Sequence, residues 1–165
     1  MAGYKLKGQC VNPATALILN VSTNGKKNAQ MTDNEINLEI KVITNFLNSE
    51  KRDRYVNFIQ NEKNRPKFLK DLSKSNFLNQ NLFESVDGNE SEIIKDRIKS
   101  IGNIKDCYVI SENKNIDQKR MSIENALAET IGADQGTLLV FGNAEFVYSE
   151  AEGFNNRWIS KKKNK

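Results

Sequence analysis

The sequence predicts an α+β fold in which a central run of helices packs on an antiparallel sheet built from N-terminal and C-terminal strands. Short β-prone runs lie near both ends of the chain, and helical periodicity dominates between them. Strands and helices do not alternate regularly, as a doubly wound parallel sheet would require. With 165 residues, of which 38% are hydrophobic, we expect one domain over residues 1–160 and a basic tail at 161–165.

The N-terminal strand is predicted at residues 14–21, where Ala-Thr-Ala-Leu-Ile-Leu-Asn-Val forms an apolar run of strand length. Asn24-Gly25 follows it as a turn signal. The alternating residues 4–7 fit either a second strand or a disordered terminus.

The first helix is predicted to begin at Thr32, because Thr32 and Glu35 have the spacing of a capping box. Ser49 is placed to cap a second helix, and Pro66 is tolerated in the first turn of a third. The first of these helices has apolar residues at helical spacing: Ile36, Ile40, Ile43 and Leu47.

Two further helices are predicted beyond a short helix or turn at residues 77–83. Asn89 is placed to cap the first of them, which ends before Gly102. Ser122 is placed to cap the second, which ends before Gly132.

The C-terminal strands begin with residues 107–110, a β-prone run. Residues 137–141 and 144–148 flank Gly142-Asn143, which predicts a hairpin. Residues 157–160 offer a last short strand.

Charge is segregated along the chain although the net charge is only +4. Residues 51–75 carry +5, residues 76–152 carry −7 and residues 153–165 carry +5. The 19 lysines outnumber the six arginines, a bias typical of an AT-rich coding sequence, so an arginine is more informative than a lysine.

The composition excludes several mechanisms. No histidine is present, so Ser-His-Asp triads, Cys-His pairs and HExxH zinc sites are impossible. Cys10 and Cys107 are too few for a structural zinc site, and we expect both to be reduced and at least partly buried. Dinucleotide-binding, P-loop and nucleophile-elbow motifs are absent. We expect a cytoplasmic protein with no cofactor, no metal and no membrane association.

A candidate anion-binding set consists of scarce arginines, a lysine stripe and the single tryptophan. The lysines at i, i+4, i+7 and i+11 would share one face of a continuous helix, and a tryptophan beside cations resembles a base-stacking site. Solvated helix faces and a buried tryptophan are the plainer interpretations. The set is Lys63, Arg65, Lys67, Lys70, Lys74, Arg157 and Trp158.

A second candidate site is the polar loop that follows the strand at 107–110. Polar residues just beyond a rigid strand are well placed for function, and clustered carboxylates are what Mg²⁺ or general acid–base chemistry needs. We weigh this against ordinary solvated acids. The candidate residues are Ser111, Glu112, Asn113, Asp117 and Glu150, with Glu145 and Glu152 as possible further carboxylates.

Three function classes follow from these observations. We favour a small intracellular noncatalytic interaction or regulatory protein, of accessory, inhibitor or immunity type, that binds a partner protein through charge-segregated surfaces. The first alternative is a nucleic-acid-binding protein that uses the basic residues 51–74 and the C-terminal Arg/Trp/Lys segment. The second is a histidine-independent enzyme that uses carboxylates and a metal. No particular oligomeric state is predicted.

Overall fold

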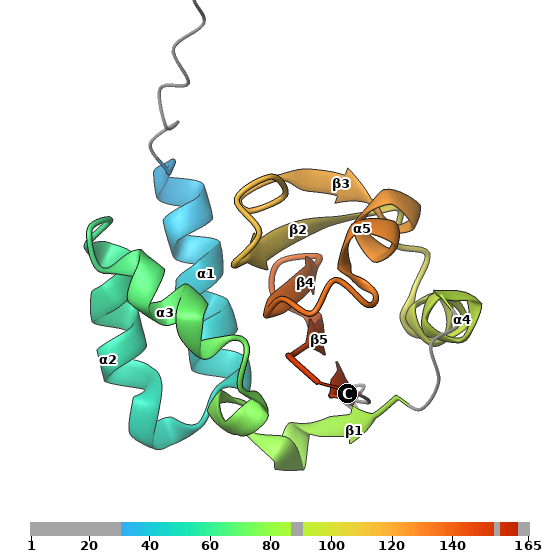
Figure 1. The fold of residues 1–165 in the computed structure, drawn as a ribbon, viewed down its shortest axis with the longest axis horizontal. Helices are drawn as coiled ribbons and strands as arrows, with labels where there is room; N and C mark the ends of the chain where they lie inside the picture. The colour runs from blue at the N-terminus through green and yellow to red at the C-terminus, as the bar shows by residue number, and fades with distance from the viewer. Residues whose placement is uncertain (1–30, 87–90, 154–155, 162–165) are drawn as a thin grey trace, which may run out of the picture.

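The computed structural model describes residues 31–86, 91–153 and 156–161. The predicted strand at 14–21, the alternating residues 4–7, the cap at Asn89 and most of the basic tail lie outside these residues. Within them, helices cover both faces of a six-stranded antiparallel sheet (Figure 1). The predicted α+β class is confirmed.

The sheet is assembled from strands that follow the first three helices. Its order is β1-β6-β5-β4-β2-β3, and every adjacent pair is antiparallel. The two edge strands, β1 and β3, are three residues long and were not predicted. The bounds are β1 (Phe83–Ser85), β2 (Asp106–Ser111), β3 (Arg120–Ser122), β4 (Thr137–Phe141), β5 (Phe146–Glu150) and β6 (Arg157–Ser160).

The hairpin signal at Gly142-Asn143 is confirmed, with a longer turn than expected. Phe141 pairs with Phe146, so four residues connect β4 to β5. Gly142 and Ala144 have φ values of 60° and 58°. The left-handed backbone at Ala144 keeps that residue in the turn, so β5 begins two residues later than predicted.

One face of the sheet is covered by α1 (Asp33–Phe46), α2 (Ser49–Gln60) and α3 (Arg65–Asp71). The capping box is present at Thr32 and Glu35. Asn48 rather than Ser49 is the N-cap residue of α2. The core on this face joins α1, α2 and α3 to alternate residues of the central strands, among them Tyr108, Leu138 and Val140.

The other face is covered by α4 (Ser91–Ile101) and α5 (Ile123–Thr130). Ser122 caps α5 as predicted, accepting from the N–H of Asn125. The core on this face takes the other alternate residues of the same strands, such as Val109 and Leu139. A sheet buried on both faces explains the apolar runs at β2 and β4.

The connection from α3 to the sheet passes through two short 3₁₀ helices, η1 (Ser75–Phe77) and η2 (Gln80–Leu82). Their position matches the short helix or turn predicted at residues 77–83. None of the helices in the described part is both long and apolar enough to cross a bilayer.

Candidate functional site

The predicted polar loop after β2 is tied down by its own side chains. Ser111 Oγ lies 2.7 Å from Thr137 Oγ1 and accepts from the N–H of Asn113 at 3.0 Å. Glu112 accepts from the N–H of Gly136 at 3.0 Å. These contacts fix the loop against the start of β4, so the three predicted residues Ser111, Glu112 and Asn113 have structural partners.

Asp117 belongs to a buried ionic network centred on Arg65. The guanidinium donates to Asp117 Oδ2 at 2.6 Å and to Glu39 Oε1 at 2.6 Å. Tyr108 donates its hydroxyl to the same Glu39 oxygen at 3.0 Å, and Asp117 also accepts from the N–H of Ser111. The network therefore ties α1, α3 and the loop after β2 to the sheet.

Burial and pairing act together on the charges of this network. The side chains of Arg65 and Glu39 are 5% and 0% exposed. Burial raises the pKa of Glu39, although the hydrogen bond from Arg65 acts to lower it. Burial alone would lower the pKa of Arg65, but hydrogen bonds to Asp117 and Glu39 raise it above its ordinary value. Arg65 thus binds two carboxylates of its own chain, whereas the sequence predicted that it would bind an external anion.

Glu150 lies in a separate buried network on the α5 side of the sheet. It accepts from the N–H of Gly132 at 2.8 Å, from the Tyr148 hydroxyl at 2.8 Å and from Arg157 at 3.2 Å. Burial, with the adjacent Glu150 charge, raises the pKa of Tyr148. Glu150 and Asp117 therefore sit in different networks rather than in one acidic site.

The remaining predicted carboxylates do not complete a cluster. Glu145 and Glu152 are exposed. Among the residues that the structure describes, no group of three or more His, Cys, Asp or Glu side chains is arranged to hold a metal ion. The structure thus gives the enzyme alternative no assembled carboxylate site in the described chain.

The predicted tryptophan–arginine pair is split between the two faces of the sheet. Trp158 and Arg157 are consecutive in β6, so their side chains point in opposite directions. Arg157 joins the buried Glu150 network, whereas Trp158 packs against the core under α1–α3. They do not form one stacking and phosphate-binding surface, which corrects the predicted pairing.

The four lysines of the predicted stripe do not lie on one continuous helix, but all of them are at the surface. Only Lys67 and Lys70 belong to α3, whereas Lys63 precedes it and Lys74 follows it. All four lysines are exposed. Lys67 donates to Asn64 Oδ1 at 2.9 Å and lies 5.7 Å from the centre of the Phe58 ring. We call Lys63, Lys67, Lys70 and Lys74 the lysine surface.

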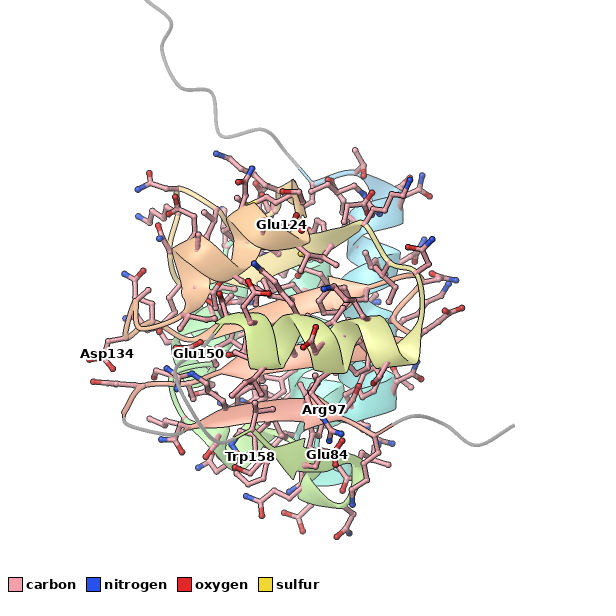
Figure 2. The ribbon with its side chains drawn as sticks, turned by 90° about the vertical axis from the view of Figure 1, so that its right-hand side faces the viewer. Glu84, Arg97, Glu124, Asp134, Glu150 and Trp158 are labelled. Atoms are coloured by element: carbon pink, nitrogen blue, oxygen red, sulfur yellow. The ribbon has the colours of Figure 1, made fainter. Side chains whose placement is uncertain are left out.

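An acidic segment lies on the opposite side of the sheet, at α5 and the loop that follows it. Residues 123–136 contain three acids and no cation. Glu124, Glu129 and Asp134 are all exposed, and Figure 2 shows Glu124 and Asp134 on this side. Cations and acids of neighbouring α4 are instead paired, as in Lys95 with Glu92 and Lys99 with Asp96. The two sides of the molecule therefore differ in charge.

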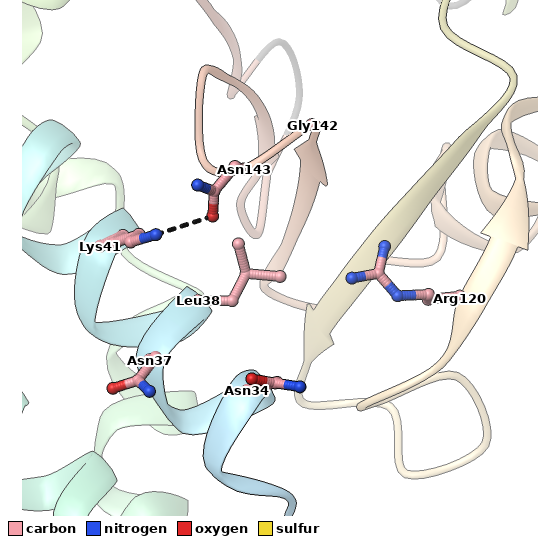
Figure 3. A pocket seen from close by; sticks show the side chains of 7 residues that line it. All are labelled: Asn34, Asn37, Leu38, Lys41, Arg120, Gly142 and Asn143. Atoms are coloured by element: carbon pink, nitrogen blue, oxygen red, sulfur yellow. Dashed lines mark hydrogen bonds between the residues drawn. The ribbon is translucent and has the colours of Figure 1, made fainter.

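Sequence reasoning missed a pocket between the N-terminal half of α1 and the end of the sheet. It has a volume of about 410 Å³ and contains two cations but no carboxylate among its lining residues. The scarcity of arginine was a signal in the sequence that could have drawn attention to Arg120. Figure 3 shows the lining residues: Asn34, Asn37, Leu38, Lys41, Arg120, Gly142 and Asn143.

A second cavity, of about 440 Å³, lies beside η1 and η2. Its lining is rich in carboxamides and has no charged side chain: Asn48, Asn76, Leu78, Asn79, Gln80 and Asn81. It carries no electrostatic preference comparable to that of the first pocket.

Comparison with known proteins does not assign a function. The chain matches no protein-family model, and neither the curated proteins nor the solved structures contain a significant match. Function is therefore inferred from the placement and chemistry of the side chains.

Proposed function

We propose that this chain is a small intracellular, noncatalytic regulatory or accessory domain that binds an acidic partner protein through the lysine surface. One observation carries the proposal. The four lysines are exposed and make no ion pair within the described residues, whereas Asp117 and Glu150 of the candidate acidic site are held in buried networks.

The electrostatics of the lysine surface favour contact with an acidic macromolecule. Residues 51–75, which include most of α2 and all of α3, carry five more cations than acids, whereas the acidic α5 segment lies on the other side of the sheet. Such separation orients an approaching partner and raises the association rate. Buried structural networks behind the surface keep α3 fixed, so little ordering cost is incurred on binding.

A protein partner is favoured over nucleic acid because the arginines near this surface have bonding partners within the chain. Arg65 and Arg157 are buried and ion-paired. Arg54 pairs with Asp71 on the same helical layer. Planar, bidentate phosphate recognition is the property of arginine, so the exposed lysines offer charge without that geometry.

Charge reversal tests the proposal. The variant Lys63→Glu/Lys70→Glu/Lys74→Glu replaces three exposed lysines whose side chains make no hydrogen bond or ion pair among the described residues. The control Lys105→Glu/Lys114→Glu/Lys119→Glu changes the net charge equally at other exposed positions. A protein captured from native cells by the wild type is purified, and its association is then measured at several salt concentrations.

We expect the lysine-surface variant to weaken binding by about tenfold or more, mainly through slower association, and the control to bind like the wild type. Equal binding by both variants would contradict the proposal. Loss of every captured protein after nuclease treatment would instead support the nucleic-acid alternative.

A further inference from the structure

We infer that the pocket lined by Lys41 and Arg120 binds a small phosphate-bearing ligand. The pocket lies at the N-terminal half of α1, apart from the lysine surface, and the inference is independent of the proposed protein contact. It rests on the state of Arg120, on the way the fold holds the two cations and on the chemistry of the lining.

Arg120 differs from the other arginines of the chain. Arg52 donates to the carbonyl of Leu47 at 3.0 Å. Four others pair with carboxylates: Arg54, Arg65, Arg97 and Arg157. Arg120 makes neither an ion pair nor a hydrogen bond through its side chain within the described residues. Its guanidinium points into the pocket, as Figure 3 shows.

The sheet register places Arg120 on the α1 side. Arg120 is the cross-strand partner of Tyr108, so both side chains project from the same face. The Tyr108 hydroxyl is held by Glu39 of α1, and the guanidinium lies 5.9 Å from the centre of the tyrosine ring. Arg120 is therefore positioned by packing while its donors remain available.

Lys41 is positioned from the opposite side of the pocket. Its ammonium group donates to Asn143 Oδ1 in the β4–β5 turn at 2.9 Å. Leu38 lies between Lys41 and Arg120 and gives the pocket an apolar patch. Two cations from elements distant in the sequence thus line one cavity, an arrangement that an anion would stabilise.

Two carboxylates of α1, Glu35 and Glu39, are engaged by other groups. Glu35 accepts from both the N–H and the hydroxyl of Thr32, each at 2.8 Å. Glu39 is paired with Arg65. Neither carboxylate belongs to the pocket lining, so neither neutralises Lys41 or Arg120 by direct contact.

The lining chemistry matches a phosphate group with further polar atoms attached. The guanidinium supplies a planar fork of donors and the ammonium a point charge, the two forms in which proteins hold phosphate oxygens. Three carboxamides, from Asn34, Asn37 and Asn143, add neutral donors and acceptors. A volume of about 410 Å³ is larger than one phosphate needs and is that of a site for a small metabolite.

Titration of the full chain with inorganic phosphate and with ribose 5-phosphate, followed by NMR at constant ionic strength, tests the inference. We expect saturable shifts at Asn37 and at the Arg120 side chain, with ribose 5-phosphate binding more tightly than inorganic phosphate. Arg120→Gln and Lys41→Gln should each weaken binding about tenfold, and Arg120→Lys less, because it keeps the charge but loses the fork.

Lys119→Gln is the matched control, since it removes one exposed positive charge beside Arg120 in sequence. It should bind like the wild type, as should the lysine-surface variant. The inference is overturned if no shift saturates, if Lys119→Gln weakens binding as much as Arg120→Gln, or if binding disappears only in the lysine-surface variant. Unchanged unfolding midpoints for the exposed Lys41 and Arg120 variants show that a loss of binding is not a loss of fold.

Discussion

At the scale of single residues, the partners of a buried charge are set by contacts that the sequence does not display. Arg65 lies 26 residues from Glu39 and 52 from Asp117. Residue type alone favoured an anion-binding role for Arg65, and it does bind carboxylates, but those of its own chain. The sequence marked Asp117 as a candidate site residue in a polar loop; in the structure it pairs with Arg65 of α3, a contact that no local pattern reveals.

Replacing Arg65 with methionine should destabilise the protein by about 3–5 kcal/mol, because Glu39 and Asp117 would lose their buried counter-charge. Urea unfolding measures this change. Lys63→Met, at an exposed position, should lie within about 0.5 kcal/mol of the wild type. The double variant Glu39→Leu/Arg65→Met should be more stable than Arg65→Met alone, because Glu39 no longer leaves a buried charge without its partner. If the double variant is instead less stable than the single variant, the proposed role of the network is refuted.

The thiol of Cys107 should be unreactive in the folded protein. The side chain is buried, and burial, with Asp106 adding to it, raises its pKa to about 12. In a Cys10→Ser background, alkylation at about pH 8 should be slower by roughly a thousandfold than in urea, since only the thiolate reacts. Modification of the native protein at the denatured rate would show that Cys107 is accessible.

At the scale of elements, features that depend on residues close in sequence could be predicted. Strands that form by pairing with distant segments could not. The capping box at Thr32, the cap at Ser122 and the β4–β5 hairpin each depend on neighbours in sequence. The edge strands β1 and β3 are strands only because β6 and β2 lie beside them. Three residues are too few to show alternation, so their strand character has no local signal.

The glycines that bracket the α5–β4 turn have different reasons to be glycine. A Cβ at Gly136 would lie 2.3 Å from the backbone carbon of Leu72, whereas Gly132 has open space but a φ of +74°. We expect Gly136→Ala to cost about 3 kcal/mol through overpacking and Gly132→Ala about 1 kcal/mol through left-handed backbone strain. Thermal and urea unfolding of the two variants would rank them, and the reverse order would contradict the close approach of Leu72 and Ser73, just after α3, to this turn.

At the scale of the whole molecule, the fold class followed from the order of helical and strand patterns, but the layering did not. The sequence interpretation had one run of helices on the sheet; the structure splits the helices between its two faces. Residues of α1 and α4 carry similar amphipathic patterns, and such a pattern says only that one side of a helix is buried. Which face of the sheet it covers depends on the length and path of the connections.

Because both cores share the central strands, the protein should unfold as one unit. Phe68→Ala, in α3, and Leu127→Ala, in α5, each empty a fully buried position and should cost about 3–5 and 2–5 kcal/mol. Trp158 fluorescence reports on the α1–α3 side, whereas far-UV circular dichroism reports on all helices. The two probes should give the same midpoint in each variant, and Ile93→Ala, at a residue 44% exposed, should change it little. A Leu127→Ala variant that shifts the dichroism midpoint but not the fluorescence midpoint would show that the two cores unfold separately.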